Sequence, residues 1–306
     1  MKLGFVSAIL DSWTYEEMMD FASEHGFECV EAACWPQGKA ERRYAGVCHI
    51  DAEKVLTDDA YADHITEYSK EKHVEISALA FYPNTMDGNP EKRTSAVEHL
   101  KRVIQASDKL GIGMVTTFIG RDQTKTVEEN LEIVREVWPP IIRLAEEKKV
   151  KIAIENCPML FGREQWPGGH NLFTSPALWR KMFDIIPSKN FGINYDPSHF
   201  VWQMMDYIQP IYEFRERIFH VHYKDIKVYP QKLKDVGIMA YPLEYMEPKL
   251  PGLGDVDWGR YVSALTDIGY DGFTCVEVED RAFEADRERI LDSLKLSKRY
   301  IEQFVI

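Results

Sequence analysis

Four short apolar runs in this chain each end in side chains that can bind a metal ion. Glu155 and Asp196 each end one run, a third run (218–224) carries two histidines, and a fourth (272–277) ends in a glutamate. Together they offer three carboxylates and an imidazole, a donor set that can hold a divalent cation. Because carboxylates also remove and return protons, the same set is suited to acid–base chemistry.

Side-chain alternation shows which residues in two of these runs share a face, but not which of them binds the metal. Residues two apart in a strand point to the same face. His220 and His222 therefore share one face, and Glu277 and Glu279 share another. Each residue alone has an ordinary structural role open to it, such as capping a turn or filling a core. The recurrence of such groups at four strand ends favours a metal site, but it does not choose between neighbours two apart.

The elements that must position these groups follow from the hydrophobic pattern, in which short β-like runs alternate with long stretches of helical period. The clearest expected helices are 15–25, 61–72, 94–110, 127–148, 176–185, 258–268 and 287–304. The expected strands are 3–7, 29–33, 75–80, 114–118, 151–155, 191–196, 218–224 and 272–277. Eight strands with intervening helices are typical of a (β/α)8 barrel, whose strands end at one catalytic face. We therefore predict an α/β fold, a TIM barrel that forms a single domain over residues 1–306.

An open, doubly wound sheet is the main alternative, because the pattern does not show whether a sheet closes. No Gly-x-Gly-x-x-Gly motif follows the first expected strand, which argues against a dinucleotide-binding version. Two connections, 157–175 and 225–257, are long. Since both follow strands with candidate metal ligands, we expect them to lie over the barrel mouth as binding loops. A surface insertion that makes an oligomer contact is the alternative for each.

Composition limits the expected partners and location. The chain has 50 acidic and 37 basic residues, which gives a formal net charge of −13 at pH 7. Because nucleic acids and anionic membranes attract basic surfaces, we expect neither as a partner. No apolar run approaches the ~20 residues of a membrane span, and the first ten residues lack a signal-peptide pattern. Five scattered cysteines without a CxxC pair indicate reduced thiols and a cytoplasmic protein.

The chain resembles the xylose-isomerase-like superfamily of barrels, in the branch of sugar phosphate isomerases and epimerases related to ketose 3-epimerases, inosose dehydratases and endonuclease IV. The resemblance covers essentially the whole chain and is specific for the superfamily, but not for a substrate. It rests on these segments in this order: Ile154-Glu155-Asn156, Asp196-Pro197-Ser198-His199, His220-Val221-His222-Tyr223-Lys224-Asp225, Pro251-Gly252-Leu253-Gly254-Asp255-Val256-Asp257-Trp258, and Gly269-Tyr270-Asp271-Gly272 leading to Val276-Glu277.

Carried over position by position, the resemblance implies roles for individual residues. It selects His222 over His220 and Glu277 over Glu279. In related epimerases the two metal-bound glutamates also form the acid–base pair, which implies that role for Glu155 and Glu277. The oxygen-rich donor set favours Mn²⁺, with Mg²⁺, Co²⁺ or Zn²⁺ as alternatives. The implied ligands of one divalent cation are Glu155, Asp196, His222 and Glu277.

Other residues are expected to contact the substrate or to support the metal ligands. His199 matches the family position that usually faces the substrate. Lys224 is expected to bind the substrate or to pair with a ligand glutamate, and a pair with Asp225 is the alternative. The remaining candidates for the substrate pocket are Asn156, His170, Trp166 and Glu31.

The implied activity is that of a metal-dependent sugar isomerase or epimerase. Such an enzyme removes a proton next to a carbonyl and returns it elsewhere, while the cation stabilises the enediolate. The alternative is a lyase, in which the same enolate expels a group, as in inosose dehydration or the cleavage of a 3-keto-glycoside. We expect a small sugar-like molecule as the substrate, and relatives that form dimers or tetramers suggest a homo-oligomer.

Two other functions are disfavoured by the sequence. Cleavage of abasic DNA, as in endonuclease IV, needs further histidines, and the chain lacks an Asp-x-His pair between Asp225 and Gly254. A barrel that only senses sugars or stabilises another subunit would normally have lost a ligand, whereas all four ligand types are present.

Overall fold

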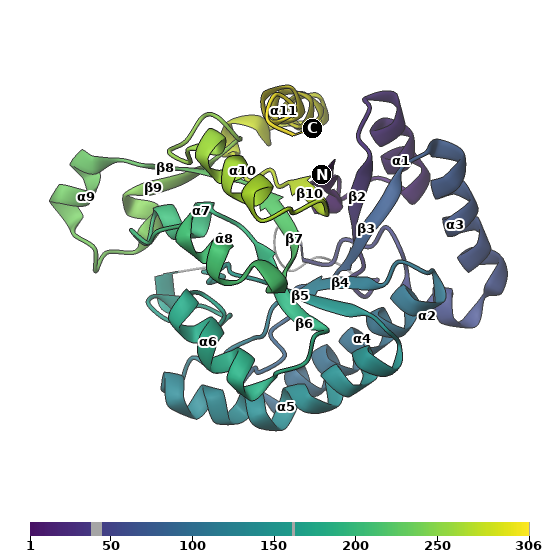
Figure 1. Cartoon of the computed structure of the whole chain (residues 1–306), viewed down its shortest axis with the longest axis horizontal. Coiled ribbons are helices and arrows are strands. Elements are labelled where there is room, and N and C mark those ends of the chain that lie inside the picture. Colours follow the sequence, from purple (N-terminus) through teal and green to yellow (C-terminus); the bar gives the residue numbers. More distant parts are fainter. Residues whose placement is uncertain (38–44, 161–162, 306) are drawn as a thin grey trace.

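The strands predicted from the apolar runs form a closed parallel barrel. The computed structural model describes residues 1–37, 45–160 and 163–305, and Figure 1 shows the strands surrounded by helices. Within these residues the barrel has the strand order β1-β10-β7-β6-β5-β4-β3-β2. Its strands are β1 (Lys2–Val6), β2 (Cys29–Ala33), β3 (Glu75–Ala80), β4 (Met114–Thr117), β5 (Lys151–Glu155), β6 (Phe191–Tyr195), β7 (Ile218–Tyr223) and β10 (Phe273–Val276).

Each of these strands agrees with its predicted range to within one residue at each end. The barrel closes because β1 pairs in parallel with both β10 and β2, and Gly4, for example, is aligned with Cys275 on one side and Cys29 on the other. The prediction of a single TIM barrel is therefore confirmed, and the open sheet is excluded.

The long helices also follow the predicted periodicity, and additional short helices lie in the connections. Among the described residues none of the helices is long and apolar enough to cross a lipid bilayer. The helices are α1 (Tyr15–Glu24), α2 (Ala52–Thr57), α3 (Asp59–Lys72), α4 (Pro90–Lys109), α5 (Val127–Glu147), α6 (Pro176–Ile185), α7 (Ser198–Val201), α8 (Gln209–Glu213), α9 (Pro230–Val236), α10 (Trp258–Asp267) and α11 (Arg287–Ile301). The short helices α2, α7, α8 and α9 were not predicted from the sequence.

Local sequence signals explain where several helices begin and end. Thr14 and Glu17 form a capping box at the start of α1, so two N–H groups that the helix leaves unpaired are satisfied. Thr126 and Glu129 do the same for α5. Gly269, which follows α10, has a φ of 70°, a left-handed conformation that favours glycine.

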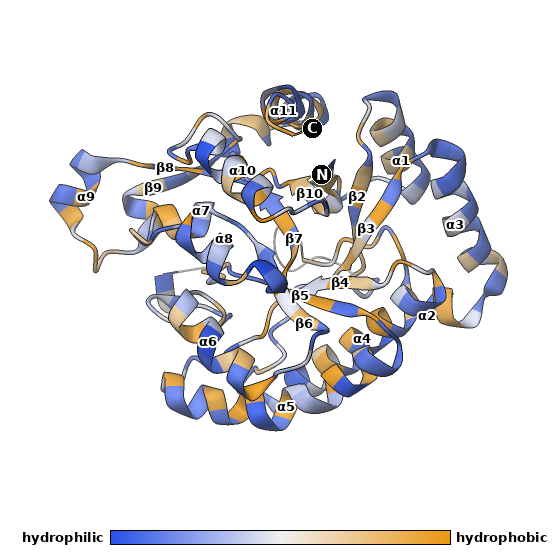
Figure 2. Ribbon diagram, in the orientation of Figure 1, coloured by the Kyte–Doolittle hydropathy of each residue, from blue (hydrophilic) through white to orange (hydrophobic). Residues whose placement is uncertain are grey.

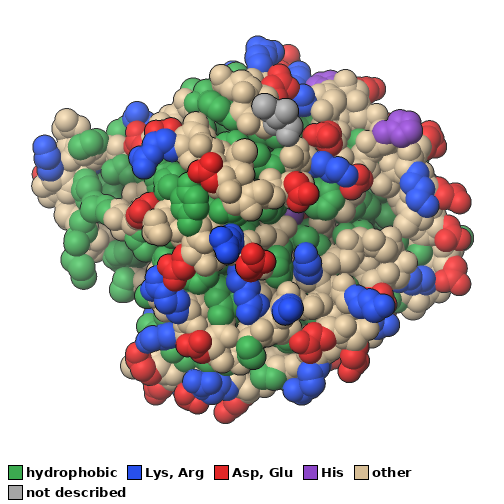
Figure 3. All heavy atoms as spheres, viewed as in Figure 1, with side chains coloured by type: hydrophobic (Ala, Val, Ile, Leu, Met, Phe, Trp, Pro, Cys, Tyr) green, Lys and Arg blue, Asp and Glu red, His purple; other side chains and the backbone are tan. Residues whose placement is uncertain are grey.

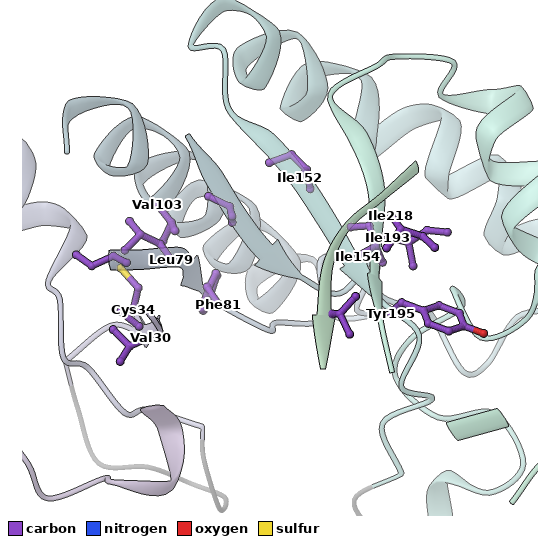
Figure 4. Packing of buried hydrophobic residues seen from close by; sticks show 14 of the residues in the cluster. Val30, Cys34, Leu79, Phe81, Val103, Ile152, Ile154, Ile193, Tyr195 and Ile218 are labelled. Atoms are coloured by element: carbon purple, nitrogen blue, oxygen red, sulfur yellow. The ribbon is translucent and has the colours of Figure 1, made fainter. Parts of the chain in front are cut away.

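Alternating side chains divide the core into two layers. Ile152 and Ile154 of β5 belong to the large cluster that also contains helix residues such as Trp138, so they face the helices. Figure 4 shows them with Ile193 of β6 and other buried hydrophobic residues. Ala153, between them in sequence, packs instead with Phe219 in a small separate cluster. Figure 2 shows that the helices around the barrel carry both hydrophobic and hydrophilic residues along their length. The face of β5 that carries Ala153 therefore also carries Glu155 into the barrel.

A two-stranded projection leaves the barrel after β7, and we call residues 225–249 the arm. It contains β8 (Asp225–Val228), α9 and β9 (Met246–Lys249), and its two strands pair antiparallel. The arm extends at the left of Figure 1, well away from the barrel axis. The sequence predicted a long connection over the barrel mouth here, but not this secondary structure.

The carboxylate of Asp225 fixes the base of the arm. It accepts hydrogen bonds from the backbone N–H groups of Gly252 and Val256 and from the indole N–H of Trp258, at 2.9 to 3.0 Å. A Cβ on Gly254 would lie 2.2 Å from the Asp225 carboxylate, so the segment can wrap this closely only with glycine there. The Pro-Gly-Leu-Gly motif thus closes around a side chain of the protein itself.

Candidate metal centre

The four residues expected to bind a metal meet at the carboxyl ends of neighbouring strands. Glu155 is the last residue of β5, Asp196 directly follows β6, His222 lies in β7 and Glu277 directly follows β10. One donor atom from each lies within 4.8 Å of the others. Glu155, Asp196 and His222 are buried, and the side chain of Glu277 is 17% exposed. The barrel therefore gathers the whole set at one point.

Three donor atoms of this set are buried among charged side chains and lack hydrogen bonds. Within the described residues, Oε1 of Glu155, Oδ2 of Asp196 and Nδ1 of His222 make no hydrogen bond. His222 Nδ1 lies 3.4 Å from Glu277 Oε2 and 3.8 Å from Glu155 Oε1. Leaving a buried polar atom unpaired costs about 1–3 kcal/mol, so it is rarely tolerated without a function. Convergence of three such atoms, all suited to a hard or borderline cation, fits a divalent metal ion.

Glu31 determines which nitrogen of His222 faces this point. Its carboxylate lies 2.6 Å from His222 Nε2 and accepts hydrogen bonds from Tyr82 and Thr116. Burial raises the pKa of Glu31, but His222 and the other donors outweigh burial and lower it to about 2. Because an ionised carboxylate can only accept, His222 donates from Nε2, and in the neutral ring the lone pair is on Nδ1.

His220 is placed differently from His222. Its Nδ1 lies 3.1 Å from Asn194 Oδ1, and its Nε2 lies 3.1 Å from Ser77 Oγ. Both ring nitrogens are therefore engaged by the protein. Although Glu31, His220 and His222 also form a compact cluster, their contacts form a hydrogen-bonded support beneath the candidate ligands.

Lys224 supplies positive charge at the same point. Its Nζ lies 2.8 Å from Glu277 Oε2, 3.1 Å from Asp196 Oδ2 and 3.3 Å from Glu279 Oε2, and the side chain is 2% exposed. Burial lowers the pKa of this amine, but the surrounding carboxylates outweigh burial and raise it well above its usual value. The ammonium group thus faces the ligand carboxylates rather than Asp225.

The same charges keep the carboxylates ionised. Burial raises the pKa of Glu277, yet Lys224 and His222 lower it to about 2. Burial likewise opposes ionisation of Asp196, and Lys224 and His199 bring its pKa well below the usual range. Both groups are therefore anionic near neutral pH, as cation binding and proton acceptance require.

A cavity of about 530 Å³ opens over this point. Its floor contains Glu155, His199, Lys224 and Glu277. The walls are largely apolar and come from the loops after β2 and β4 and from the arm. Glu279 and Arg281, which follow β10, also line the cavity, so the charged groups lie on the floor and on the β10 side of a mostly apolar space.

Of the six residues expected to contact the substrate, two line the cavity and four lie outside its lining. His199 and Lys224 line the cavity. Glu31 and Asn156 are fully buried outside its lining, and Asn156 bonds the backbone N–H and carbonyl of Asp196, so both use their polar atoms to hold the metal ligands. Trp166 and His170 lie in the loop after β5, also outside the lining, where the Trp166 indole donates to Met239 and His170 Nδ1 contacts Asn84.

Several cavity residues were not identified from the sequence. Tyr82 and Phe118 follow β3 and β4, where an aromatic residue gives no sign of function. Trp202 lies against His199, and its indole N–H donates to His199 Nδ1 at 3.5 Å. Asn171 donates to the carbonyls of Glu155 and Cys157. For Trp202, and for Asn171, which is buried outside the cavity lining, the only available signal was a position after a strand that carries a candidate ligand.

Comparison with known proteins is consistent with this geometry. A family model described as "Xylose isomerase-like TIM barrel" matches residues 19–300. The Bacillus subtilis (strain 168) protein YfiH is 22% identical over 99% of this chain and 100% of its own length. An inosose dehydratase of Clostridium tetani (strain Massachusetts / E88) is 25% identical over 60% of each chain.

Solved structures show the same fold. The IolI protein with a bound zinc atom has a TM-score of 0.73 and 19% identity, and the match covers 99% of both chains. A D-psicose 3-epimerase from Clostridium cellulolyticum H10 has a TM-score of 0.64 and 17% identity over 100% of this chain and 99% of its own.

Proposed function

The chain belongs to the xylose isomerase-like TIM barrel family, and from this premise we propose that it is a divalent-metal-dependent sugar isomerase or epimerase. In this proposal Glu155, Asp196, His222 and Glu277 hold the cation, and Glu155 and Glu277 are the acid–base pair. The substrate is a small sugar-like molecule with a carbonyl group.

One observation carries the proposal: three buried donor atoms without hydrogen bonds converge with Glu277 on the floor of the cavity. Lys224 Nζ and His199 Nε2 approach Asp196 Oδ2 at 3.1 and 3.2 Å as ion pairs, but neither makes a hydrogen bond with it. The contacts of Glu31 and Asn156 hold His222 and Asp196 from behind, while Glu155 and Glu277 line the cavity.

Proton transfer is assigned to the two glutamates by their position. When bound, a divalent cation would stabilise negative charge that develops on the substrate's oxygen atoms. Glu155 and Glu277 end different strands and both line the cavity, so each can reach a substrate bound over the floor. One removes the proton next to the carbonyl and the other returns it. Lys224, between the carboxylates, offsets their charge and can hydrogen-bond a substrate oxygen.

The comparisons support this reading without fixing the reaction. The zinc atom of the IolI structure and the D-psicose 3-epimerase are consistent with a metal and with a sugar substrate. We propose Mn²⁺ as the native cation because the donor set is mostly oxygen. The cytoplasmic location and a homo-oligomeric state stay predictions from the sequence.

The direct test is hydrogen exchange during turnover of a panel of ketoses, 3-keto-glycosides and inososes in D₂O, with Mn²⁺ and after chelation. We expect metal-dependent deuterium incorporation with retention of all carbons, and its loss in Glu277→Gln. The matched variant Glu279→Gln, which changes the glutamate two residues away, should retain exchange. No exchange on any member by metal-replete protein would refute the proposed activity.

A lyase is the second candidate, and the donor groups beside the carboxylates favour it. His199 and Lys224 both line the cavity next to Glu155 and Glu277, so the site has more N–H donors than a simple proton shuttle needs. Either donor could protonate a leaving group as the enolate collapses. The inosose dehydratase similarity agrees with such chemistry. Metal-dependent loss of water or of an aglycone in the same assay would establish it.

A further inference from the structure

The cavity is larger and more apolar than a free sugar requires. Cavities of about 300–1,000 Å³ typically enclose drug-sized ligands, and this one measures about 530 Å³. Sugars carry hydroxyl groups on every side, and a hydroxyl buried without a partner is unfavourable. The charged groups that could bind hydroxyls lie on the floor and on the adjoining β10 side, where Glu279 and Arg281 line the cavity.

Two apolar walls rise from opposite sides of the barrel. One comes from β2 and β4 and includes Trp35 and Phe118. The other is the arm, which follows β7 and contributes Ile226, Leu243 and Met246. In the strand order of the closed barrel, β7 stands directly across from β3, which lies between β2 and β4. A ligand bound on the floor therefore has apolar surface on both sides.

Polar atoms near these walls are already used by the protein. The Tyr82 hydroxyl donates to Glu31 at 2.5 Å, and the Trp202 indole donates to His199 at 3.5 Å. These groups present mainly their ring faces and edges to the cavity. The walls are thus suited to an aromatic or aliphatic group rather than to hydroxyls.

The arm wall is packed independently of the barrel core. Trp202, Ile226, Tyr245 and Met246 form a hydrophobic cluster separate from the barrel core. Beyond it, apolar side chains remain in solvent, with Leu243 38% exposed and Ile238 62% exposed. Figure 3 shows hydrophobic side chains gathered over the projecting arm. Because Leu243 both lines the cavity and reaches solvent, the apolar surface continues from the cavity to the outside.

We propose that the substrate is a keto-sugar that carries an apolar aglycone, and that the arm binds this aglycone while the floor binds the sugar. The inference rests on the proposed function only for the sugar half of the substrate. The aglycone half follows from the two walls and from the continuity of the arm surface with the floor.

Binding of unreacted glycosides tests the proposal without requiring turnover. The wild-type chain, loaded with Mn²⁺, is titrated by calorimetry with matched methyl and phenyl glycosides of several hexoses and their 3-keto forms. Burial of the phenyl group should tighten binding by about 10- to 100-fold over the methyl glycoside. Leu243→Asp should remove most of this gain and leave the methyl glycoside unchanged. Ile238→Asp, on the same arm but outside the cavity lining, should keep the gain.

Each outcome tests the aglycone site independently of the proposed activity. Equal affinity for methyl and phenyl glycosides, or no binding of any phenyl glycoside, overturns the aglycone site even if the enzyme exchanges protons on free ketoses. A phenyl gain that survives Leu243→Asp also overturns the assignment to the arm. A phenyl gain lost in Leu243→Asp supports it, even if no deuterium exchange occurs.

Discussion

The floor of the cavity and the arm beside it are stabilised by different interactions. The floor is a buried polar network in which Glu31 and Asn194 each contact two or more side chains from other strands or their ends, and Asn156 holds Asp196. The arm is held by an apolar cluster that it shares with Trp202, by the Asp225 carboxylate at its base, and by surface contacts such as those of Glu244 with Arg163 and of the Met239 carbonyl with Trp166. The floor grows from paired strands, whereas the arm is an insertion after one of them.

We infer from this difference that the floor carries out the chemistry and the arm recognises the substrate. The donor atoms on the floor are fixed by strand register, which a barrel specifies strongly because each strand is paired on both sides. The arm can change its side chains without moving the floor, as is usual for loops that carry specificity. Substitutions on the floor should therefore alter the reaction, and those on the arm should alter affinity.

The largest effect is expected at the floor. Glu277→Gln keeps the side-chain shape but removes a carboxylate that we assign to both metal binding and proton transfer. We expect kcat/KM to fall by about 10³-fold, which corresponds to about 4 kcal/mol of transition-state stabilisation. Steady-state kinetics on the substrate identified in the exchange assay measures this. A loss below tenfold would remove Glu277 from the acid–base pair.

A smaller effect, on metal affinity, is expected at Glu31, which lies beneath His222. Glu31→Gln replaces the anion that accepts from His222 with a neutral amide, so His222 Nδ1 is less firmly presented. Loss of such a supporting contact typically lowers metal affinity by about 10- to 100-fold. Chelator competition with Mn²⁺ measures the affinity, and Glu132→Gln, on the exposed face of α5, is the control. Unchanged affinity would show that Glu31 does not orient the ligand.

His49 is a buried histidine outside the candidate metal site, so its titration should affect the stability of the scaffold and not the chemistry of the floor. Burial lowers its pKa to about 4, although the hydrogen bond between Nε2 and the Leu10 carbonyl partly opposes this shift; Nδ1 is paired with Ser7 Oγ. Since the unfolded chain binds this proton near pH 6.5, the stability contribution is complete above that pH and is lost as pH falls toward 4. The loss is about 1.4 kcal/mol per pH unit.

Urea unfolding between pH 4 and 7.5 measures this dependence. His49→Gln removes the titrating group, so its free energy of unfolding should fall less steeply with acid than that of the wild type. Identical slopes for the two proteins would exclude His49 as the source.

The smallest effect is expected at the arm. Trp166→Phe removes the hydrogen bond from the indole to the Met239 carbonyl, 2.9 Å long, which ties the arm to the loop after β5. We expect the arm to open more readily by about 0.5–1.5 kcal/mol, with global stability unchanged. Hydrogen exchange of the arm amides reports the local change. An equal drop in global stability would show that the arm unfolds only together with the barrel.

The fold was predictable to a large extent, because its signals are local. The apolar runs, the capping residues Thr14 and Thr126, and the glycines after helices mark the elements at short range. The arm was not predictable as a hairpin. Its strands are short and only partly buried, so their alternation is weak, and they are stable through contacts with Trp202 and the Asp225 turn.

The candidate site was predictable as a set of positions but not as an arrangement. Strand ends and the family resemblance pointed to the carboxylates and to His222. A supporting role for the Asn156 amide was expected, but the role of Glu31 was not apparent, because a buried acid that orients a ligand and one that touches a substrate look alike in sequence.

The sequence by itself determined that strands and helices alternate and that Glu155, Asp196 and Glu277 stand at strand ends, since hydrophobic period and turn residues act within a few positions. Only the tertiary structure decided which atoms meet. Glu31 reaches His222 across 191 residues of sequence, and this contact exists because barrel closure fixes the register of distant strands. The apolar cavity walls depend on the same closure, which sets the arm across from Trp35 and Phe118.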